Sequence, residues 1–373
     1  MAGIYLHIPF CKQRCTYCDF HFSTSFQSYR KDLIAALCKE IELRKTEINE
    51  HIQTIYFGGG TPSLLENSEL VLILKTIYFN FSVSDNIEIT LEANPEDIDS
   101  ERLEFWKTHG INRLSIGLQS FKESDITWMN RAHLASDGEK AVRLAQKIGF
   151  ENITVDLIYG LPQLTINEWQ NHLERVVNLG IPHVSAYCLT VEPKTALHHQ
   201  VKHRQLITAN EDEQSEQFET MVAYLKSQGF EHYEISNFAK NECYSKHNSS
   251  YWQGVHYLGI GPSAHSFNGT ERRWNIANNS VYYKNVGENE SWFTIEKLTN
   301  NEQWNELFLT GLRTKWGVSK SALATIDTFT TSEEKLLNQY KQKGDIKENE
   351  THYTLSESGK LQADGIASAF FRV

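Results

Sequence analysis

Three cysteines near the N-terminus are the residues of this chain best suited to chemistry. Cys11, Cys15 and Cys18 form a C-x3-C-x2-C pattern directly after the apolar run "IYLHI". A structural zinc site takes four nitrogen or sulfur ligands and usually supplies its cysteines as two C-x2-C pairs. The second pair is missing, so zinc remains an option only if His7 or His21 completes a Cys3His set.

A [4Fe–4S] cluster accounts better for three thiols without a fourth. The cluster has four iron corners that are normally held by four thiolates, so three cysteines leave one iron open to a small molecule. The remaining cysteines lie far apart in the sequence, unlike the disulfide framework of a small secreted protein. Among them, Cys38 shares a helical face with Leu37 and Ile41 and is expected to be a small core residue.

Strand-like and helical segments alternate over the first part of the chain, and they must position these thiols. Runs rich in Ile, Val and Tyr predict strands at 4–8, 52–57, 87–93, 113–118, 153–160 and 183–189. Helical periodicity fills the intervals, at 29–47, 65–79, 100–109, 137–148 and 167–179. A polar or glycine-rich stretch follows every strand. Six such strand ends facing one site predict an α/β fold, a partial (β/α)6 barrel with its chemistry at the carboxyl ends of the strands.

The alternation lapses beyond residue 205. A helix is expected within 210–230, with its acidic start as a solvated face, and one more strand at 233–239. We therefore divide the chain into a barrel (1–205), a barrel extension (206–290) and a smaller C-terminal α/β module (291–373). The last has helices at 300–313 and 333–343 followed by a short β ribbon, which resembles a winged helix.

Composition and charge exclude several classes of function. The 373 residues are 40% hydrophobic and 22% charged, as in an ordinary globular protein. The formal charge of −11 argues against nucleic acid and against anionic membranes, and the winged-helix-like module itself carries 10 basic and 11 acidic residues. The chain has no run of 18 apolar residues and no basic, apolar leader, so we expect a cytoplasmic protein without a transmembrane segment.

The cysteine loop after a first strand resembles the radical S-adenosylmethionine superfamily. In order, the blocks "IYLHIPFC", "YFGGGTPSLL", "LEANP", "SIGLQSF", "DLIYGLP" and "HNSSYWQGVHYLGIGPSAHS" are similar to its oxygen-independent coproporphyrinogen III oxidase family. The resemblance implies a [4Fe–4S] cluster on Cys11, Cys15 and Cys18. It also implies S-adenosylmethionine bound to the open iron, with the capacity to cleave that cofactor.

The same resemblance implies a set of cofactor-binding residues. The S-adenosylmethionine contacts of the family fall on Tyr5, Gly59, Gly60, Thr61, Glu92, Gln119, Arg131 and Asp156. A guanidinium fork suits the methionine carboxylate, and carboxylate or amide groups can hydrogen-bond ribose hydroxyls. The sequence leaves one alternative open, because Glu92 or Asp156 could instead cap the helix that follows it.

The family has an enzyme branch (HemN type) and a haem-chaperone branch (HemW type). The enzyme branch carries a further cysteine two residues after the last cluster ligand, where this chain has Phe20, and a segment before the first strand, which here begins by Ile4. Both departures favour a chaperone that binds haem and delivers it to recipient haem proteins, without coproporphyrinogen dehydrogenase activity. The alternative is that dehydrogenase, and a more distant one is a radical enzyme acting on another tetrapyrrole. The resemblance leaves a homodimer open.

The block "HNSSYW" (247–252) is the third feature of the chaperone branch. Imidazole is a common axial ligand of haem, so we predict that His247 binds haem, with Cys243 and His265 as the next candidates. The alternative is a structural histidine that bonds a loop while Tyr251 and Trp252 fill a core. The nearby "GIGPSA" matches a dinucleotide-binding pattern, but its proline and the lack of a following helix lead us to reject that function.

Overall fold

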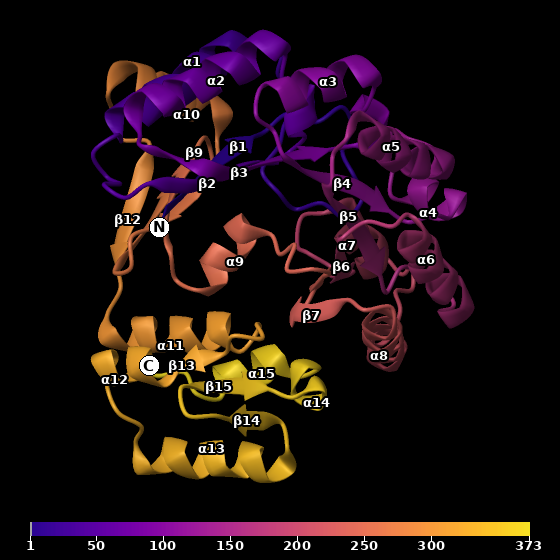
Figure 1. The fold of residues 1–373 in the computed structure, drawn as a ribbon, viewed down its shortest axis with the longest axis vertical. Helices are drawn as coiled ribbons and strands as arrows, with labels where there is room; N and C mark the ends of the chain where they lie inside the picture. Colours follow the sequence, from indigo (N-terminus) through magenta and orange to yellow (C-terminus); the bar gives the residue numbers. More distant parts are fainter. Residues whose placement is uncertain (1) are drawn as a thin grey trace.

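A curved sheet wrapped by helices makes up the larger part of the molecule. A computed structural model describes residues 2–373 (Figure 1). The middle of the sheet consists of parallel strands in chain order: β1 (Ala2–Ile8), β2 (Ile52–Gly59), β3 (Val83–Ala93), β4 (Arg113–Gln119), β5 (Asn152–Tyr159) and β6 (His183–Cys188). Each predicted strand coincides with one of these six, so the partial (β/α)6 barrel is confirmed.

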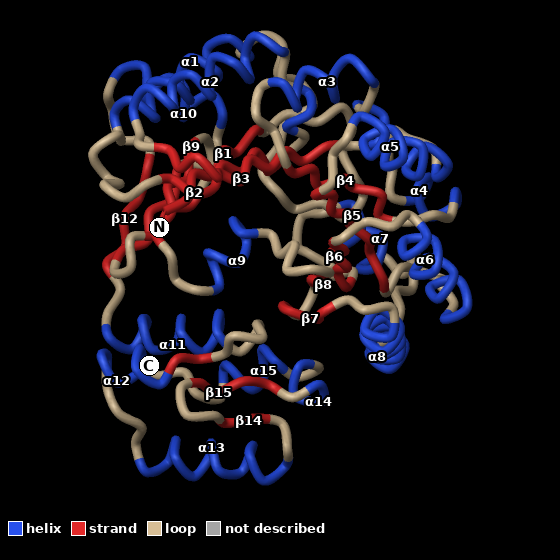
Figure 2. The backbone as a smooth tube through the Cα atoms, viewed as in Figure 1, coloured by secondary structure: helices blue, strands red, loops and turns tan. Residues whose placement is uncertain are grey.

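Helices connect these strands and cover the outside of the curve, as Figure 2 shows. In α6, Trp169, Leu173 and Val176 recur at helical spacing and are all fully buried, which gives the helix its inward face. Thr165 caps that helix and pairs with Glu168 in a capping box. The connecting helices are α1 (Arg30–Leu43), α2 (Asn67–Asn80), α3 (Ser100–Thr108), α4 (Glu123–Trp128), α5 (Ala135–Ile148) and α6 (Ile166–Asn178).

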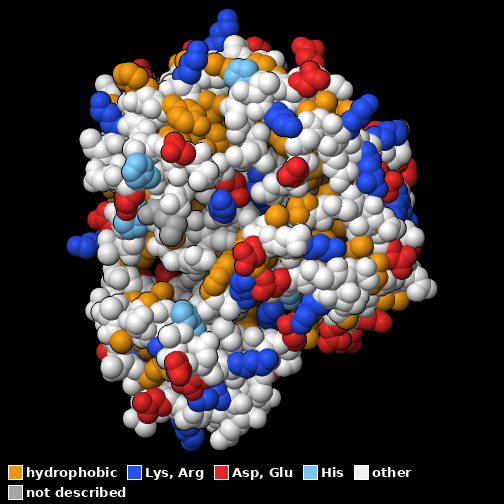
Figure 3. Space-filling model, in the orientation of Figure 1, with side chains coloured by type: hydrophobic (Ala, Val, Ile, Leu, Met, Phe, Trp, Pro, Cys, Tyr) orange, Lys and Arg blue, Asp and Glu red, His pale blue; other side chains and the backbone are white. Residues whose placement is uncertain are grey.

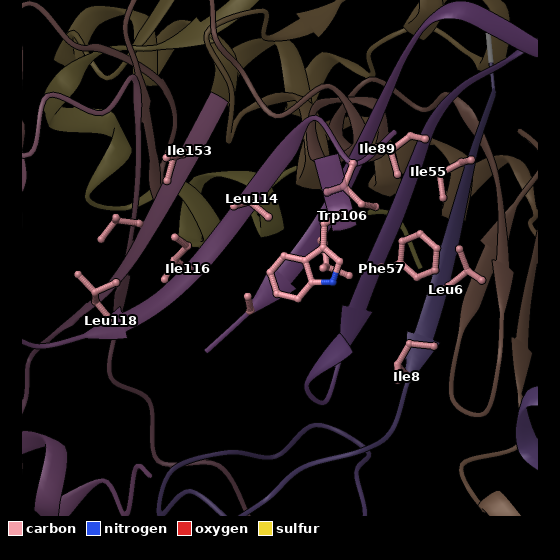
Figure 4. Close-up of a cluster of buried hydrophobic side chains, with 14 of the residues drawn as sticks. Leu6, Ile8, Ile55, Phe57, Ile89, Trp106, Leu114, Ile116, Leu118 and Ile153 are labelled. Atoms are coloured by element: carbon pink, nitrogen blue, oxygen red, sulfur yellow. The ribbon is translucent and has the colours of Figure 1, made fainter. Parts of the chain in front are cut away.

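The strands of the barrel are apolar on their outer side and polar on their inner side. Successive side chains of a strand point to opposite faces. The outer set includes Leu6, Ile55, Phe57, Ile89 and Leu114, and it packs against Trp106 of α3 and the neighbouring helices, as the close-up in Figure 4 shows. The inner set alternates with it and includes Thr54, Tyr56, Glu88, Glu92, Arg113 and Asp156. Strand alternation therefore directs the carboxylates into the barrel.

The extension lengthens the sheet at both edges, and here one prediction is wrong. Residues 233–239 do not form one strand, because the Ser236 amide donates to the Glu234 side chain and the chain reverses there. Two antiparallel strands result. The elements of the extension are β7 (Glu231–Glu234), β8 (Asn237–Ala239), β9 (His256–Ile260), β10 (His265–Phe267), β11 (Glu271–Asn275), α8 (Glu211–Ser227), α9 (Lys246–Trp252) and α10 (Asn279–Glu288). Helix α7 (Ala196–Lys202) precedes it, and β12 (Phe293–Lys297) pairs with β11, so the large sheet continues past residue 290.

The "GIGPSA" segment is a structural turn. It begins in β9, which pairs with β1 in parallel, and leads through Gly261 into β10 rather than into a helix. Gly261 has a φ of 103°, and a Cβ atom there would lie 2.6 Å from the His7 carbonyl oxygen. Glycine is needed for this close approach of two backbones. The segment therefore has a strand–turn–strand context and not the strand–turn–helix context of a dinucleotide fingerprint.

The C-terminal module has its own core and its own sheet. Trp304, Phe308 and Phe370 are completely buried in it. It docks on the barrel edge through main-chain bonds, from Ile235 N–H to the Arg313 carbonyl (3.1 Å) and from Lys315 N–H to the Tyr233 carbonyl (2.9 Å). Its elements follow the order of a winged helix: α11 (Asn300–Gly311), β13 (Val318–Ser319), α12 (Lys320–Ile326), α13 (Thr331–Lys343), β14 (Ile346–Glu348), β15 (His352–Leu355), then α14 (Glu357–Lys360) and α15 (Ala363–Ser368).

Surface charge and helix length add two general observations. Basic and acidic side chains are interspersed over the face drawn in Figure 3, without a continuous basic stripe on that face. Across residues 2–373, none of the helices combines the length and the apolar character that crossing a bilayer would require.

Candidate functional site

A cavity of about 510 Å³ opens at the carboxyl ends of β1 to β6. Every one of these strands, or the loop after it, contributes to its wall, as expected for a (β/α) barrel. Most of the predicted site residues line it together: Cys11, Cys15, Cys18, Gly59, Gly60, Thr61, Glu92, Gln119, Arg131 and Asp156. Tyr5 and His247 are outside this lining set.

The three cysteines of the loop after β1 are free thiols that are partly exposed to the cavity. Burial raises the pKa of the Cys11 thiol to about 11 and that of the Cys18 thiol to about 12. These two groups therefore hold their protons at neutral pH until a metal replaces them. The Thr61 hydroxyl lies 3.5 Å from Cys11 Sγ as a donor, a contact that favours the thiolate.

This donor set fits an iron–sulfur cluster. Within residues 2–373, no three Cys, His, Asp or Glu side chains converge as the ligands of a single metal ion do. A [4Fe–4S] cluster does not need such convergence, since each of its irons takes its own thiolate. The zinc alternative required a histidine, but His7 Nε2 contacts the His21 carbonyl at 2.7 Å and His21 Nε2 contacts Asn279 Oδ1 at 2.7 Å. One nitrogen of each ring therefore already contacts a group other than the thiols.

The glycines at the end of β2, Gly59 and Gly60, bring main chain to the cavity wall. Gly59 has a φ of 105°, and a Cβ atom there would lie 2.6 Å from the His7 ring. A Cβ atom on Gly60 would lie 2.7 Å from the carbonyl oxygens of Ile8 and Phe10. The loop can pass this close to β1 only without side chains. Its main chain is thereby held against the cavity, where a bound ligand can approach it.

Glu92 lies at the end of β3 with both carboxylate oxygens bonded. The Tyr56 hydroxyl donates to Oε1 (2.8 Å) and the Gly59 amide donates to Oε2 (3.2 Å). Burial raises the pKa of Glu92 to about 7, and the charge of Asp156 adds to the rise. A buried carboxylate of this kind gains from a cationic ligand, because the cation replaces part of the lost hydration.

Asp156 and Gln119 occupy the neighbouring strand ends. Ser115 donates its hydroxyl to Asp156 (3.0 Å), and burial raises the pKa of that carboxyl to about 6. Gln119 has a φ of 66° at a bulge where β4 slips against β5. Non-glycine residues in this conformation are uncommon and cluster at functional sites. The helix-capping alternative fails, since α3 begins with Asp99 as its cap and α6 with Thr165.

Arg131 reaches the cavity from the loop after α4. Its Nη2 donates to Asn94 Oδ1 (2.6 Å) and to the Gly117 carbonyl (3.0 Å), and its Nη1 lies 3.7 Å from Cys15 Sγ. The guanidinium is thus fixed beside a cluster thiol, where it can meet a carboxylate. Asn94 also donates to Thr61 (3.4 Å) and was not identified from the sequence, although its block "EANP" marks a strand end.

Tyr5 and His247 lie behind the cavity wall. Tyr5 stacks on Tyr56, with ring centroids 6.1 Å apart, and its hydroxyl lies 3.2 Å from His7 Nδ1. His247 is only 1% exposed, with Thr54 Oγ1 2.7 Å from Nδ1 and the Tyr251 hydroxyl 2.6 Å from Nε2. In this conformation both ring nitrogens have partners inside the barrel.

Comparison with known proteins agrees with this geometry. The model of the radical SAM superfamily matches residues 5–176. The chain is 33% identical to a protein of Bacillus subtilis named "Heme chaperone HemW", over 99% of both chains. The chain belongs to the HemW family. A HemW of Synechocystis is 32% identical over 87% of this chain and 81% of its own length.

The fold of this HemW-family chain also matches a solved enzyme structure. Coproporphyrinogen III oxidase (HemN) of Escherichia coli superimposes with a TM-score of 0.85 over 99% of this chain and 89% of that one. The two sequences are 24% identical, so this likeness shows the shared radical SAM fold and does not extend to the reaction.

Proposed function

We propose that this protein is a cytoplasmic haem chaperone of the HemW type, which binds haem, a [4Fe–4S] cluster and S-adenosylmethionine and delivers the haem to recipient haem proteins. The observation that carries the proposal is the full-length similarity to relatives named haem chaperone. Phe20 supports it, because the enzyme branch has a cysteine at that position.

The cavity residues divide between the two cofactors in this proposal. Cys11, Cys15 and Cys18 would hold the cluster, which supplies the electron for cleavage of S-adenosylmethionine. Glu92 would meet the cationic amino group of that cofactor and Arg131 its carboxylate, because each side chain carries the opposite charge at the cavity wall. Asp156, Gln119 and the Gly59–Gly60 main chain would complete the contacts.

The outer part of the cavity suits an apolar, planar ligand. Phe20 is 66% exposed and Tyr187 is 43% exposed, although both are large aromatic side chains. Both line the same cavity as the cysteines. Exposed aromatic faces at a cavity are adapted to stacking, which porphyrins favour.

One anaerobic experiment separates the chaperone from the dehydrogenase. Cluster-reconstituted, reduced protein is incubated with S-adenosylmethionine and coproporphyrinogen III, and 5′-deoxyadenosine and protoporphyrinogen are followed together. We expect no protoporphyrinogen, and a separate titration should show stoichiometric haem binding by its Soret band. Formation of protoporphyrinogen would establish the enzyme instead.

His247 as the axial ligand remains a prediction that the same titration tests. Its Nε2 must first leave the Tyr251 hydroxyl. If His247 binds the iron, His247→Ala shifts the Soret band, whereas Tyr251→Phe strengthens haem binding roughly fivefold by removing a competing hydrogen bond worth about 1 kcal/mol. An unchanged Soret position and affinity in both variants would direct attention to Cys243 and His265.

A further inference from the structure

Helix α9, which carries the HNSSYW block, lies inside the curve of the sheet, between the barrel and the C-terminal module (Figure 1). It is anchored to two strands. Glu88 of β3 accepts from the main-chain amides of Lys246 (3.0 Å) and His247 (3.3 Å). Thr54 of β2 bonds the His247 ring at 2.7 Å. These are the strands that end in the glycine loop and in Glu92.

The His247 ring packs directly against the tyrosine that holds Glu92. Its centroid lies 5.2 Å from that of Tyr56, with the two planes 27° apart, and 6.3 Å from that of Tyr5. The three rings form one stacked group beneath the cavity. Across this group, the Tyr56 hydroxyl donates to Glu92, whose carboxylate lines the cavity.

Neighbouring residues on three segments hold the His247 ring in place against Tyr56. A Cβ atom on Gly3 would lie 3.1 Å from the ring, so the ring occupies space that a side chain at this position of β1 would need. Thr54 and Tyr251 hold its two nitrogens. Burial lowers the pKa of His247 to about 3, so the imidazole is neutral and can donate through one nitrogen and accept through the other.

We propose that His247 is a positioning residue of the S-adenosylmethionine site, which fixes Tyr56 and, through its hydroxyl, the carboxylate of Glu92. The inference rests on the proposed cofactor site and goes beyond the role of His247 toward haem. Helix α9 also contacts the C-terminal module, because Arg313 of that module lies over the Trp252 ring at 5.2 Å. The C-terminal module therefore contacts α9 at Trp252, and the cofactor site contacts the same helix at His247.

The pH dependence of S-adenosylmethionine affinity can show whether Tyr56 is held in place to donate to Glu92. S-adenosylmethionine carries positive charge, so its affinity should fall as Glu92 becomes protonated. The charged groups that act on Glu92 are Asp156 of β5 and Arg113 of β4. The titratable groups that also interact with it are Tyr5, Tyr187, Tyr251 of α9 and the cluster thiol of Cys11, and His247→Gln replaces none of them. Tyr56→Phe removes one donor to the carboxylate and should move the midpoint of the affinity profile upward by about one pH unit, a tenfold change in proton affinity.

The test measures the equilibrium binding of S-adenosylmethionine to cluster-reconstituted, unreduced protein between about pH 6 and pH 9. His247→Gln retains polar atoms for both neighbours but removes the stacked ring. We expect it to raise the midpoint as Tyr56→Phe does, and the double variant to resemble either single one. Ser250→Ala, on the same helix with only a bond to the Lys246 carbonyl, serves as the matched control and should leave the profile unchanged.

Two results would overturn the inference: a His247→Gln profile that superimposes on that of the unaltered protein, or effects that add fully in the double variant. Iron and sulfide content are measured for each protein. If His247→Gln does not retain the cluster, Tyr251→Phe replaces it, since it removes only the partner of Nε2, and an unchanged midpoint there counts against the inference. Failure of the unaltered protein to bind S-adenosylmethionine would instead refute the proposed function.

Discussion

The buried carboxylate of Glu92 should lower the stability of the fold at high pH, and Glu92→Gln should remove this loss of stability. In the fold its pKa rises from 4.5 to about 7, with burial as the main cause. The folded state then binds this proton more tightly than the unfolded state, so stability is lost as pH rises from about 4.5 to about 7. The linkage relation gives a cost of about 3 kcal/mol at pH 8.5 and about 1.4 kcal/mol at pH 5.5.

The substituted amide cannot reproduce both hydrogen bonds of the carboxylate. It can accept from Tyr56 or from the Gly59 amide but not from both in the same geometry, which costs about 1 kcal/mol. That loss is the same at both pH values, so it cancels when they are compared. Glu92→Gln should therefore gain about 2 kcal/mol more at pH 8.5 than at pH 5.5, a relative rise in melting temperature of about 2–3 °C for a chain of this length.

The assay is thermal unfolding of the metal-free protein at both pH values. Glu104→Gln, an exposed residue of α3, removes the same charge without the burial and should show no difference between the two pH values. The gain in stability should accompany weaker binding of S-adenosylmethionine at pH 8.5. If Glu92→Gln changes the melting temperature equally at both pH values, the carboxyl does not have the raised pKa and the reasoning is wrong.

Three further substitutions test other parts of the structure. Gly59→Ala should destabilise the protein by about 2 kcal/mol and block cofactor binding, since its Cβ would meet the His7 ring. Gly110→Ala has a similar φ of 91°, and its Cβ would make only an ordinary contact with Ile89 at 3.6 Å, so it controls for backbone strain. Glu234→Ala removes the buried partner of an ion pair with the partly exposed Arg313 of the C-terminal module, together with the acceptor for Ser236 and Asn237. It should cost about 3 kcal/mol, with faster release of that module in limited proteolysis. Cys15→Ala should abolish the visible absorbance of the reconstituted cluster.

The parts of the site that could be predicted are those at the ends of the parallel strands. Alternating β and α periodicity fixes the order of the strands, and parallel strands bring their carboxyl ends to one edge. Cys11 follows β1, whereas Gly59, Glu92 and Asp156 lie in the carboxyl-terminal halves of β2, β3 and β5, and all four residues line one cavity. Local sequence patterns are enough to predict these residues, because the parallel topology brings the ends of the strands together at one edge of the sheet.

The residues behind the cavity could not be predicted in the same way. Strands β9 to β12 are short, and all four pair antiparallel with one another outside the βα repeat. Helix α9 has only seven residues, too few to show a period. His247 and Thr54 are 193 residues apart in the sequence. The sequence around either residue contains no pattern that predicts their contact.

The polarity of the barrel interior explains why such supports are needed. Glu88, Glu92 and Asp156 all have raised pKa values because they are buried on the inner face of the sheet. Each carboxylate is costly there unless donors meet it. Glu88 takes its donors from the main chain of α9, and Glu92 takes one from Tyr56, which packs against His247 of the same helix. This seven-residue helix thus supports two buried carboxylates, one by direct hydrogen bonds and the other through Tyr56. A substitution in α9 should therefore alter ligand binding in the cavity, although no residue of α9 lines it.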